Sequence, residues 1–113
     1  LRPGQIIGTP GYISPEHVLD KPLDGRSDLY STGVLFYEML TGKKPFTSRS
    51  VDELLDMHVS AAPPPLSGAL GDYQKIVDRL LAKRPDDRFK SAAELIAFLD
   101  EEAHDVLVGA TGI

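Results

Sequence analysis

The stretch of residues 28–41 is apolar on nearly every side when it is drawn as a helix, and Glu38 is the single charge in its interior. Ser27 is a suitable N-cap, and Gly42 is placed to end the helix before Pro45. A helix that is apolar all round is buried inside a larger body, because no side of it suits water. We therefore expect a mainly α-helical fold in which other helices surround this buried central helix.

Shorter helices are predicted on the C-terminal side of this segment. Ser50 and Glu53 have the spacing of a capping box, which predicts a helix over residues 51–59. A clear amphipathic pattern of apolar residues at i, i+3, i+4, i+7 and i+8 comes next, formed by Tyr73, Ile76, Val77, Leu80 and Leu81. Ser91 and Glu94 form a second capping box and open the last predicted helix.

The two ends of the chain have weaker patterns. Glycines and prolines interrupt residues 1–26, where only a single helical turn is expected, starting at Pro15 with Ser14 as its N-cap. Residues 104–113 are glycine-containing and predict a loose tail. We therefore assign residues 1–103 to one domain, and no strand or internal repeat is predicted.

Composition excludes several classes of function. The chain has 113 residues, a formal net charge of -5 and no cysteine. Scattered cations and an acidic balance argue against a nucleic-acid partner, and the lack of cysteine excludes disulfides and thiolate chemistry. His17, His58 and His104 are far apart, so no metal site is expected. No apolar run approaches the ~20 residues that cross a bilayer, and we expect a cytoplasmic location, with any membrane tether outside this segment.

Several motifs occur in a meaningful order. Residues 8–16 read Gly-Thr-Pro-Gly-Tyr-Ile-Ser-Pro-Glu, Asp28 and Gly33 form a D-x-x-x-x-G motif, and residues 80–89 read Leu-Leu-Ala-Lys-Arg-Pro-Asp-Asp-Arg-Phe. This order resembles the large lobe of serine/threonine protein kinases, from the end of the activation segment to the last helix, and the bacterial eukaryotic-type (Hanks-type) kinases in particular. The resemblance covers about residues 6–100 and implies a protein-kinase-like large-lobe fragment.

The resemblance implies roles in peptide binding. Thr9 would hydrogen-bond the catalytic-loop Asp and its nearby Lys, and so help to orient the base that accepts the substrate proton. Gly8, Pro10 and Tyr12 would shape the peptide pocket. Glu38 would bind a basic residue upstream of the target hydroxyl, or it is a lone charge satisfied at the helix surface.

Other residues would have structural roles. The resemblance implies a buried ion pair between Glu16 and Arg88. Asp28 would accept backbone N–H bonds from the catalytic loop. Leu35 and Met39 would lie beneath the residues that stack on the adenine of ATP.

The motifs that bind nucleotide and metal in this family are missing from these residues: the Gly-rich loop, the strand Lys and its Glu partner, H-R-D and D-F-G. The parent kinase would use ATP and Mg²⁺ to phosphorylate Ser and Thr of protein substrates, whereas this segment alone should bind neither and should be inactive. Two alternatives are a pseudokinase scaffold and a free-standing helical interaction module. The apolar central helix argues against the free-standing module, and a fragment on its own is expected to self-associate.

Overall fold

The computed structural model describes residues 10–111, and the side chains of residues 10–102. Its helices are α1 (Pro15–Val18), α2 (Gly25–Thr41), α3 (Val51–Ser60), α4 (Gln74–Leu80) and α5 (Ala92–Thr111), with 3₁₀ turns at Gly68–Tyr73 and Pro85–Asp87. No strand occurs among these described residues. The mainly α-helical class predicted from the sequence is confirmed.

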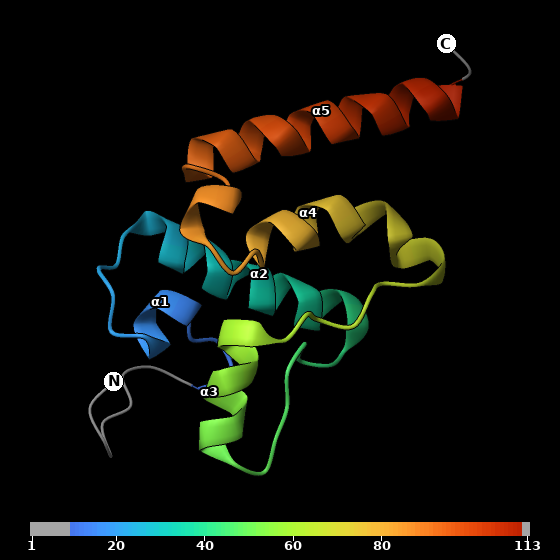
Figure 1. The fold of residues 1–113 in the computed structure, drawn as a ribbon. Coiled ribbons are helices and arrows are strands. Elements are labelled where there is room, and N and C mark those ends of the chain that lie inside the picture. Colours follow the sequence, from blue (N-terminus) through green and yellow to red (C-terminus); the bar gives the residue numbers. More distant parts are fainter. Residues whose placement is uncertain (1–9, 112–113) are drawn as a thin grey trace.

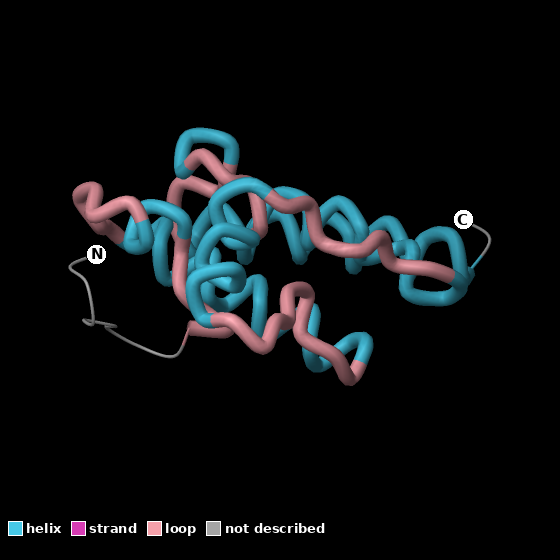
Figure 2. Tube along the Cα trace, turned by 60° about the horizontal axis from the view of Figure 1, so that its bottom comes forward, coloured by secondary structure: helices cyan, strands magenta, loops and turns pink. Residues whose placement is uncertain are grey.

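Helix α2 is the centre of the arrangement. Figure 1 shows α4 and then α5 stacked on one side of α2, with α1 and α3 on the other, and Figure 2 shows the same helices from a direction turned by 60°. Two hydrophobic clusters join α2 to α4. The first consists of Tyr30, Val34, Tyr37, Val77 and Leu81, and the second of Leu29, Ile76, Leu80 and Phe89. The core therefore lies mainly between these two helices.

Gly33 allows α2 and α4 to approach closely. A Cβ atom added at Gly33 would lie 2.6 Å from Leu80 Cβ and 3.1 Å from Leu81 Cδ2. A contact of 2.6 Å is far inside the van der Waals separation of two carbons, so any side chain here would push the helices apart. The glycine of the D-x-x-x-x-G motif thus sets the distance between the two central helices.

The predicted helix ends are mostly correct. Ser14, Ser50 and Ser91 each accept a hydrogen bond from a backbone N–H two or three residues into the following helix. Gly42 ends α2 in the left-handed conformation, with φ of 77°. The start of α2 was predicted wrongly, because its N-cap is Asp24, whose Oδ1 accepts from Arg26 N at 2.8 Å.

The burial of α2 differs from the expectation. Leu29, Tyr30 and Val34 are buried, but Leu35 is 49% exposed and Met39 is 74% exposed. The described residues therefore cover α2 on some sides and leave one apolar flank open. The prediction of a helix buried all round is wrong for that flank, since nothing among residues 10–102 packs over it.

Helix α5 is longer than expected. It continues to Thr111, through residues that the sequence assigned to a loose tail. The Ala, Leu and Val residues of this stretch tolerate helical geometry, and the preceding Glu101 and Glu102 disfavour the helix too weakly to end it. None of the described helices has the combination of length and apolar character that crossing a bilayer demands.

Replacing Gly33 tests the close α2–α4 contact. Gly33→Ala should lower the free energy of unfolding by about 1–3 kcal/mol through overpacking, although alanine's helix propensity offsets up to about 1 kcal/mol of this. Gly71→Ala is the matched control, because nothing lies within 4 Å of its added Cβ. Urea denaturation measures both variants, and equal stability of G33A and wild type would contradict the assignment.

Candidate functional site

A buried ion pair joins two distant segments of the chain. Arg88 Nη1 donates to Glu16 Oε2 at 2.6 Å, and Arg88 Nη2 donates to Glu16 Oε1 at 2.9 Å. The side chains are 0% and 4% exposed, respectively. This is the bidentate geometry in which Arg and a carboxylate interact most strongly. The ion pair that the resemblance implied is present in the structure.

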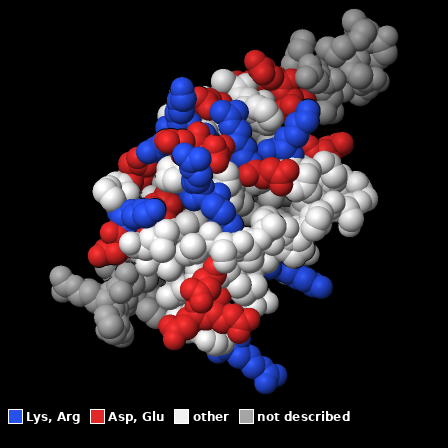
Figure 3. Space-filling model, in the orientation of Figure 1, with Lys and Arg blue, Asp and Glu red and all other residues white. Residues whose placement is uncertain are grey.

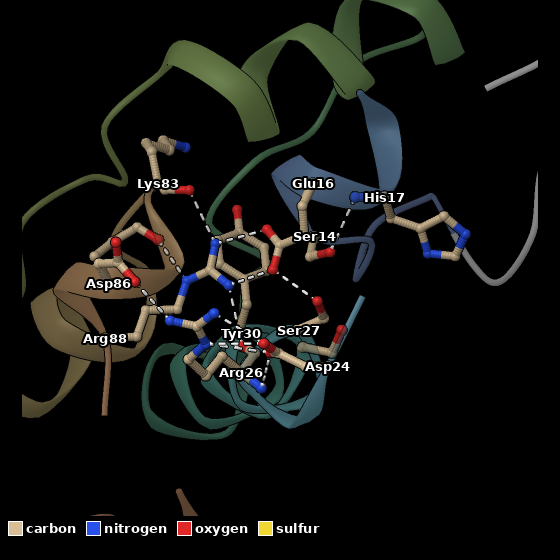
Figure 4. A network of polar contacts seen from close by, with 12 residues as sticks. Ser14, Glu16, His17, Asp24, Arg26, Ser27, Tyr30, Lys83, Asp86 and Arg88 are labelled. Carbon is tan, nitrogen blue, oxygen red and sulfur yellow. Dashed lines mark hydrogen bonds and ion pairs between the residues drawn. The ribbon is translucent and has the colours of Figure 1, made fainter. Parts of the chain in front are cut away.

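The remaining donors of Arg88 are also occupied. Its Nε, Nη1 and Nη2 donate to the backbone carbonyls of Ala82 (2.7 Å), Arg26 (3.1 Å) and Lys83 (3.0 Å). With the two bonds to Glu16, every N–H of the guanidinium has an acceptor. Figure 4 shows this network where α1, the first turn of α2 and the segment before Arg88 meet. Arg88 therefore fixes the relative positions of these three segments.

Glu16 has a second partner in Ser27. The Ser27 hydroxyl donates to Glu16 Oε2 at 2.7 Å, which explains why this serine does not cap α2. Burial by itself would raise the pKa of Glu16, but the hydrogen bonds from Arg88 and Ser27 outweigh burial and hold that pKa below its ordinary value. Glu16 is thus an ionised carboxylate in the interior of the protein.

Tyr12 lies against α2 at the other end of this N-terminal segment. Its hydroxyl donates to a carboxylate oxygen of Glu38, and its backbone oxygen accepts from Ser31 Oγ at 2.6 Å. The hydrogen bond to Glu38 raises the pKa of Tyr12. Lys44 Nζ lies 5.1 Å from the centroid of the Tyr12 ring, a cation–π distance. Glu38 is therefore already engaged with Tyr12, and only its unshared lone pairs could accept from a basic peptide side chain.

Asp28 lies at an open cleft of about 370 Å³. The polar residues that line this cleft with it are Ser14, His17, Asp24, Ser27 and Ser31. Asp28 is exposed, and its carboxylate has no hydrogen-bond partner among residues 10–102. Both oxygens are consequently available to accept hydrogen bonds at this cleft.

The other residues singled out from the sequence lie away from this network or outside the described residues. Leu35 and Met39 are one helical turn apart on the exposed flank of α2, away from the network around Arg88. Pro10 is half-buried at the start of the described chain. Gly8 and Thr9 lie outside the described residues, so their roles stay predictions. No metal-binding group of His, Asp and Glu side chains is found in the part of the chain that the structure describes.

Sequence reasoning missed a buried polar group on α3. His58 is fully buried, and a hydrogen bond of 2.8 Å joins its Nδ1 to the hydroxyl of Tyr30 on α2. Lys83 Nζ donates to the backbone oxygens of Met57 and His58, at 3.1 Å and 2.9 Å. Burial, and then the nearby Lys83 charge, lower the pKa of His58 to about 4. A single histidine in a helix that is half polar gave no signal of burial, because its neighbours come from distant segments.

The amino-acid sequence is similar to those of known proteins. A family profile described as "Protein kinase domain" matches residues 3–98. Serine/threonine-protein kinase Pkn1 of Myxococcus xanthus is 40% identical over 94 residues, which cover 80% of this chain and 14% of Pkn1. Serine/threonine-protein kinase PknB of Mycobacterium tuberculosis is 42% identical over 98 residues (83% of this chain, 16% of PknB). PknL of the same species is 39% identical over 107 residues (91% and 27%). The chain therefore spans between 14% and 27% of the length of these relatives.

The buried ion pair can be tested by removing its negative charge. Glu16→Gln should cost ~3–5 kcal/mol of unfolding free energy, because it leaves the Arg88 charge buried without a counter-charge. Asp86→Asn breaks the exposed pair with Arg26 and should cost under about 1 kcal/mol. Ser27→Ala removes one hydrogen bond of the same network and should cost about 1 kcal/mol, in a variant that keeps its fold. Similar urea midpoints for E16Q and D86N would contradict a central role for Glu16.

The buried histidine predicts an acid-sensitive fold. Above its ordinary pKa of 6.5, His58 is neutral in both the folded and unfolded states, and its contribution to stability does not depend on pH. As the pH falls from 6.5 towards 4, His58 becomes protonated in the unfolded state but stays neutral in the folded state. The free energy of unfolding should therefore decrease. Urea unfolding between pH 7.5 and 5 should show this decrease, and His58→Asn, whose side-chain amide lies near the Nδ1 position, should flatten it. An unchanged slope in H58N would assign the effect to other groups.

Proposed function

The chain belongs to the protein kinase family, as part of a serine/threonine protein kinase domain, and we propose that the protein carrying it transfers the γ-phosphoryl group of ATP to Ser and Thr hydroxyls of proteins. The observation that carries this proposal is the fully bonded Glu16–Arg88 pair, which fixes the segment after Tyr12 on top of α2. Phosphoryl transfer depends almost entirely on positioning and electrostatics, and such a rigid support is what positioning requires.

We assign the peptide-binding part of the reaction to the N-terminal segment. Gly8, Pro10 and Tyr12 would form the pocket for the residue after the target hydroxyl, while Thr9 would support the catalytic base. The hydrogen bond from Tyr12 to Glu38 favours this assignment, because it holds the aromatic ring on α2. Glu38 would attract a basic residue of the peptide with its remaining lone pairs.

We assign a positioning role to Asp28. Its uncovered carboxylate at the first turn of α2 can accept backbone N–H groups of the family's catalytic loop, which these residues do not contain. ATP and Mg²⁺ would be bound by that loop and by the other missing motifs, and a cytoplasmic location would supply the nucleotide. A parent with the same scaffold and no catalytic Asp would be a pseudokinase.

Kinase activity of the protein in its full-length form tests this function. Asp28→Ala should lower the rate of phosphate transfer from ATP to a Ser/Thr peptide about a hundredfold, since a small misplacement of catalytic groups is enough for that loss. Asp52→Ala, on the exposed face of α3, is the matched control and should keep full activity. Because Asp28 is exposed, D28A should fold normally. Undetectable transfer by the wild-type protein would overturn the enzymatic proposal and favour a pseudokinase.

We also propose that these 113 residues associate with one another when they are made alone. Leu35 and Met39 expose apolar surface on α2, and a second copy would remove it from water. Sedimentation velocity should show dimers or larger species, and the double variant Leu35→Glu, Met39→Glu should shift the distribution towards monomer. A compact wild-type monomer at the highest concentration measured would contradict the proposal.

A further inference from the structure

A second cleft, separate from the one at Asp28, lies between α1, the C-terminal end of α3 and the turn that precedes Arg88. Its volume is about 410 Å³, which falls in the range of ligand-binding clefts. Its cationic lining residues come from three different segments and are Lys21, Arg26, Lys83 and Arg84. The fold thus gathers positive charge at one place in a chain whose net charge is -5.

Both carboxylates that line this cleft are engaged by arginines. Arg88 pairs with Glu16 at 2.6 Å, and Arg26 pairs with Asp86 at 2.7 Å. Arg26 also pairs with Asp24 at 2.8 Å, so it contributes no free positive charge. Figure 4 shows both pairs close together in one polar network. Lys21 and Arg84 have no ion-pair partner among the described residues. The cleft therefore keeps an excess of positive charge after its internal pairs have formed.

Lys83 adds a partly desolvated cation. Its ammonium donates to the carbonyls of Met57 and His58 at the end of α3 and lies 4.5 Å from the centroid of the Phe46 ring. Burial, and then repulsion from Arg88, lower the pKa of Lys83 to about 8. The charge is still present at pH 7, but its environment disfavours it. A bound anion would relieve that penalty.

Part of the cleft wall is apolar. Pro15, Leu19 and Val59 line it, and Leu19 is 47% exposed at its rim. Apolar walls reduce the screening by water, so an anion inside the cleft would interact more strongly with the cations than it would on an open surface. The rim also offers a contact for an apolar neighbour of the anionic group.

We propose that this cleft binds a phosphorylated Ser or Thr side chain presented on a peptide. A phosphate group carries nearly two negative charges and three acceptor oxygens, which suits the unpaired cations Arg84 and Lys21, with the Lys83 charge beside them, better than a single carboxylate would. The identity of the ligand rests on the proposed function, because phosphoserine and phosphothreonine are the products of such a kinase. The site would let the protein hold a phosphorylated segment away from the place of phosphate transfer.

Extended polyanions fit this surface less well. Figure 3 shows acidic side chains interspersed with the basic ones on the face that it presents, and acidic side chains lie over α3. A nucleic acid or an anionic membrane needs a continuous basic surface, whereas a single phosphate needs only the cleft. The charge pattern therefore favours a small anionic group on a peptide.

Binding of synthetic peptides tests the proposal without relying on kinase activity. A fluorescein-labelled peptide library with a fixed central phosphothreonine is titrated with the full-length protein, beside the same library with Thr and with Glu at that position. Fluorescence anisotropy should show at least tenfold tighter binding of the phosphorylated library. Because the peptides are phosphorylated chemically, a failed kinase assay would leave this test intact.

Paired variants locate the binding. The double variant Lys21→Ala, Arg84→Ala should weaken phosphopeptide binding about tenfold. Lys43→Ala, Arg49→Ala, which removes one exposed Lys and one exposed Arg outside the cleft, should change it less than twofold. Equal losses in the two double variants would overturn the proposal, as would equal affinity for the Thr library. The proposal would also be overturned if inorganic phosphate bound as tightly as the phosphopeptide. Equally tight binding of vesicles in which about a fifth of the lipid is phosphatidylglycerol would overturn it too.

Discussion

The arrangement of this chain depends on one guanidinium group. Arg88 connects α1, the start of α2 and the turn after α4, and its ion-pair partner Glu16 is 72 residues away in sequence. Burying two charges costs several kcal/mol per ion, so the pair can exist only because every donor of Arg88 and both oxygens of Glu16 are bonded. Such a network adds little net stability. It specifies one geometry, since any alternative packing would leave a buried charge without partners.

The second constraint is the absence of a side chain at Gly33. Close contact with α4 makes α2 a rigid axis, and the candidate functional residues are distributed along it. Asp28 lies in its first turn and Glu38 near its end, ten residues apart, which corresponds to about 15 Å along a helix axis. One helix therefore fixes the distance between the Asp28 cleft and the hydrogen-bonded Tyr12–Glu38 pair, to which we assigned peptide binding. A shift of α2 against α4 would move both together.

The features that sequence reasoning predicted well are local ones. The caps at Ser50 and Gly42 follow from residue types and spacing within a single turn, so distant contacts hardly alter them. By the same local rule Ser27 was predicted to cap α2. It does not, because its hydroxyl donates to the buried carboxylate of Glu16 in another segment. His58 could not be predicted at all, since its burial depends on Tyr30 and Phe46, which reach it only in the folded chain. The Glu16–Arg88 pair was implied by family resemblance alone.

The buried charges of this chain are paired more completely than its apolar side chains are buried. The charges around Arg88 find all their partners within the described residues, while Leu35 and Met39 on the same central helix remain open to water. A buried charge without a partner would cost about 3–5 kcal/mol of stability, whereas an exposed leucine forgoes only the hydrophobic gain of about 1.5–3 kcal/mol that its burial would bring. The segment can therefore build its own support for Tyr12 and Asp28 and still present an apolar flank on α2.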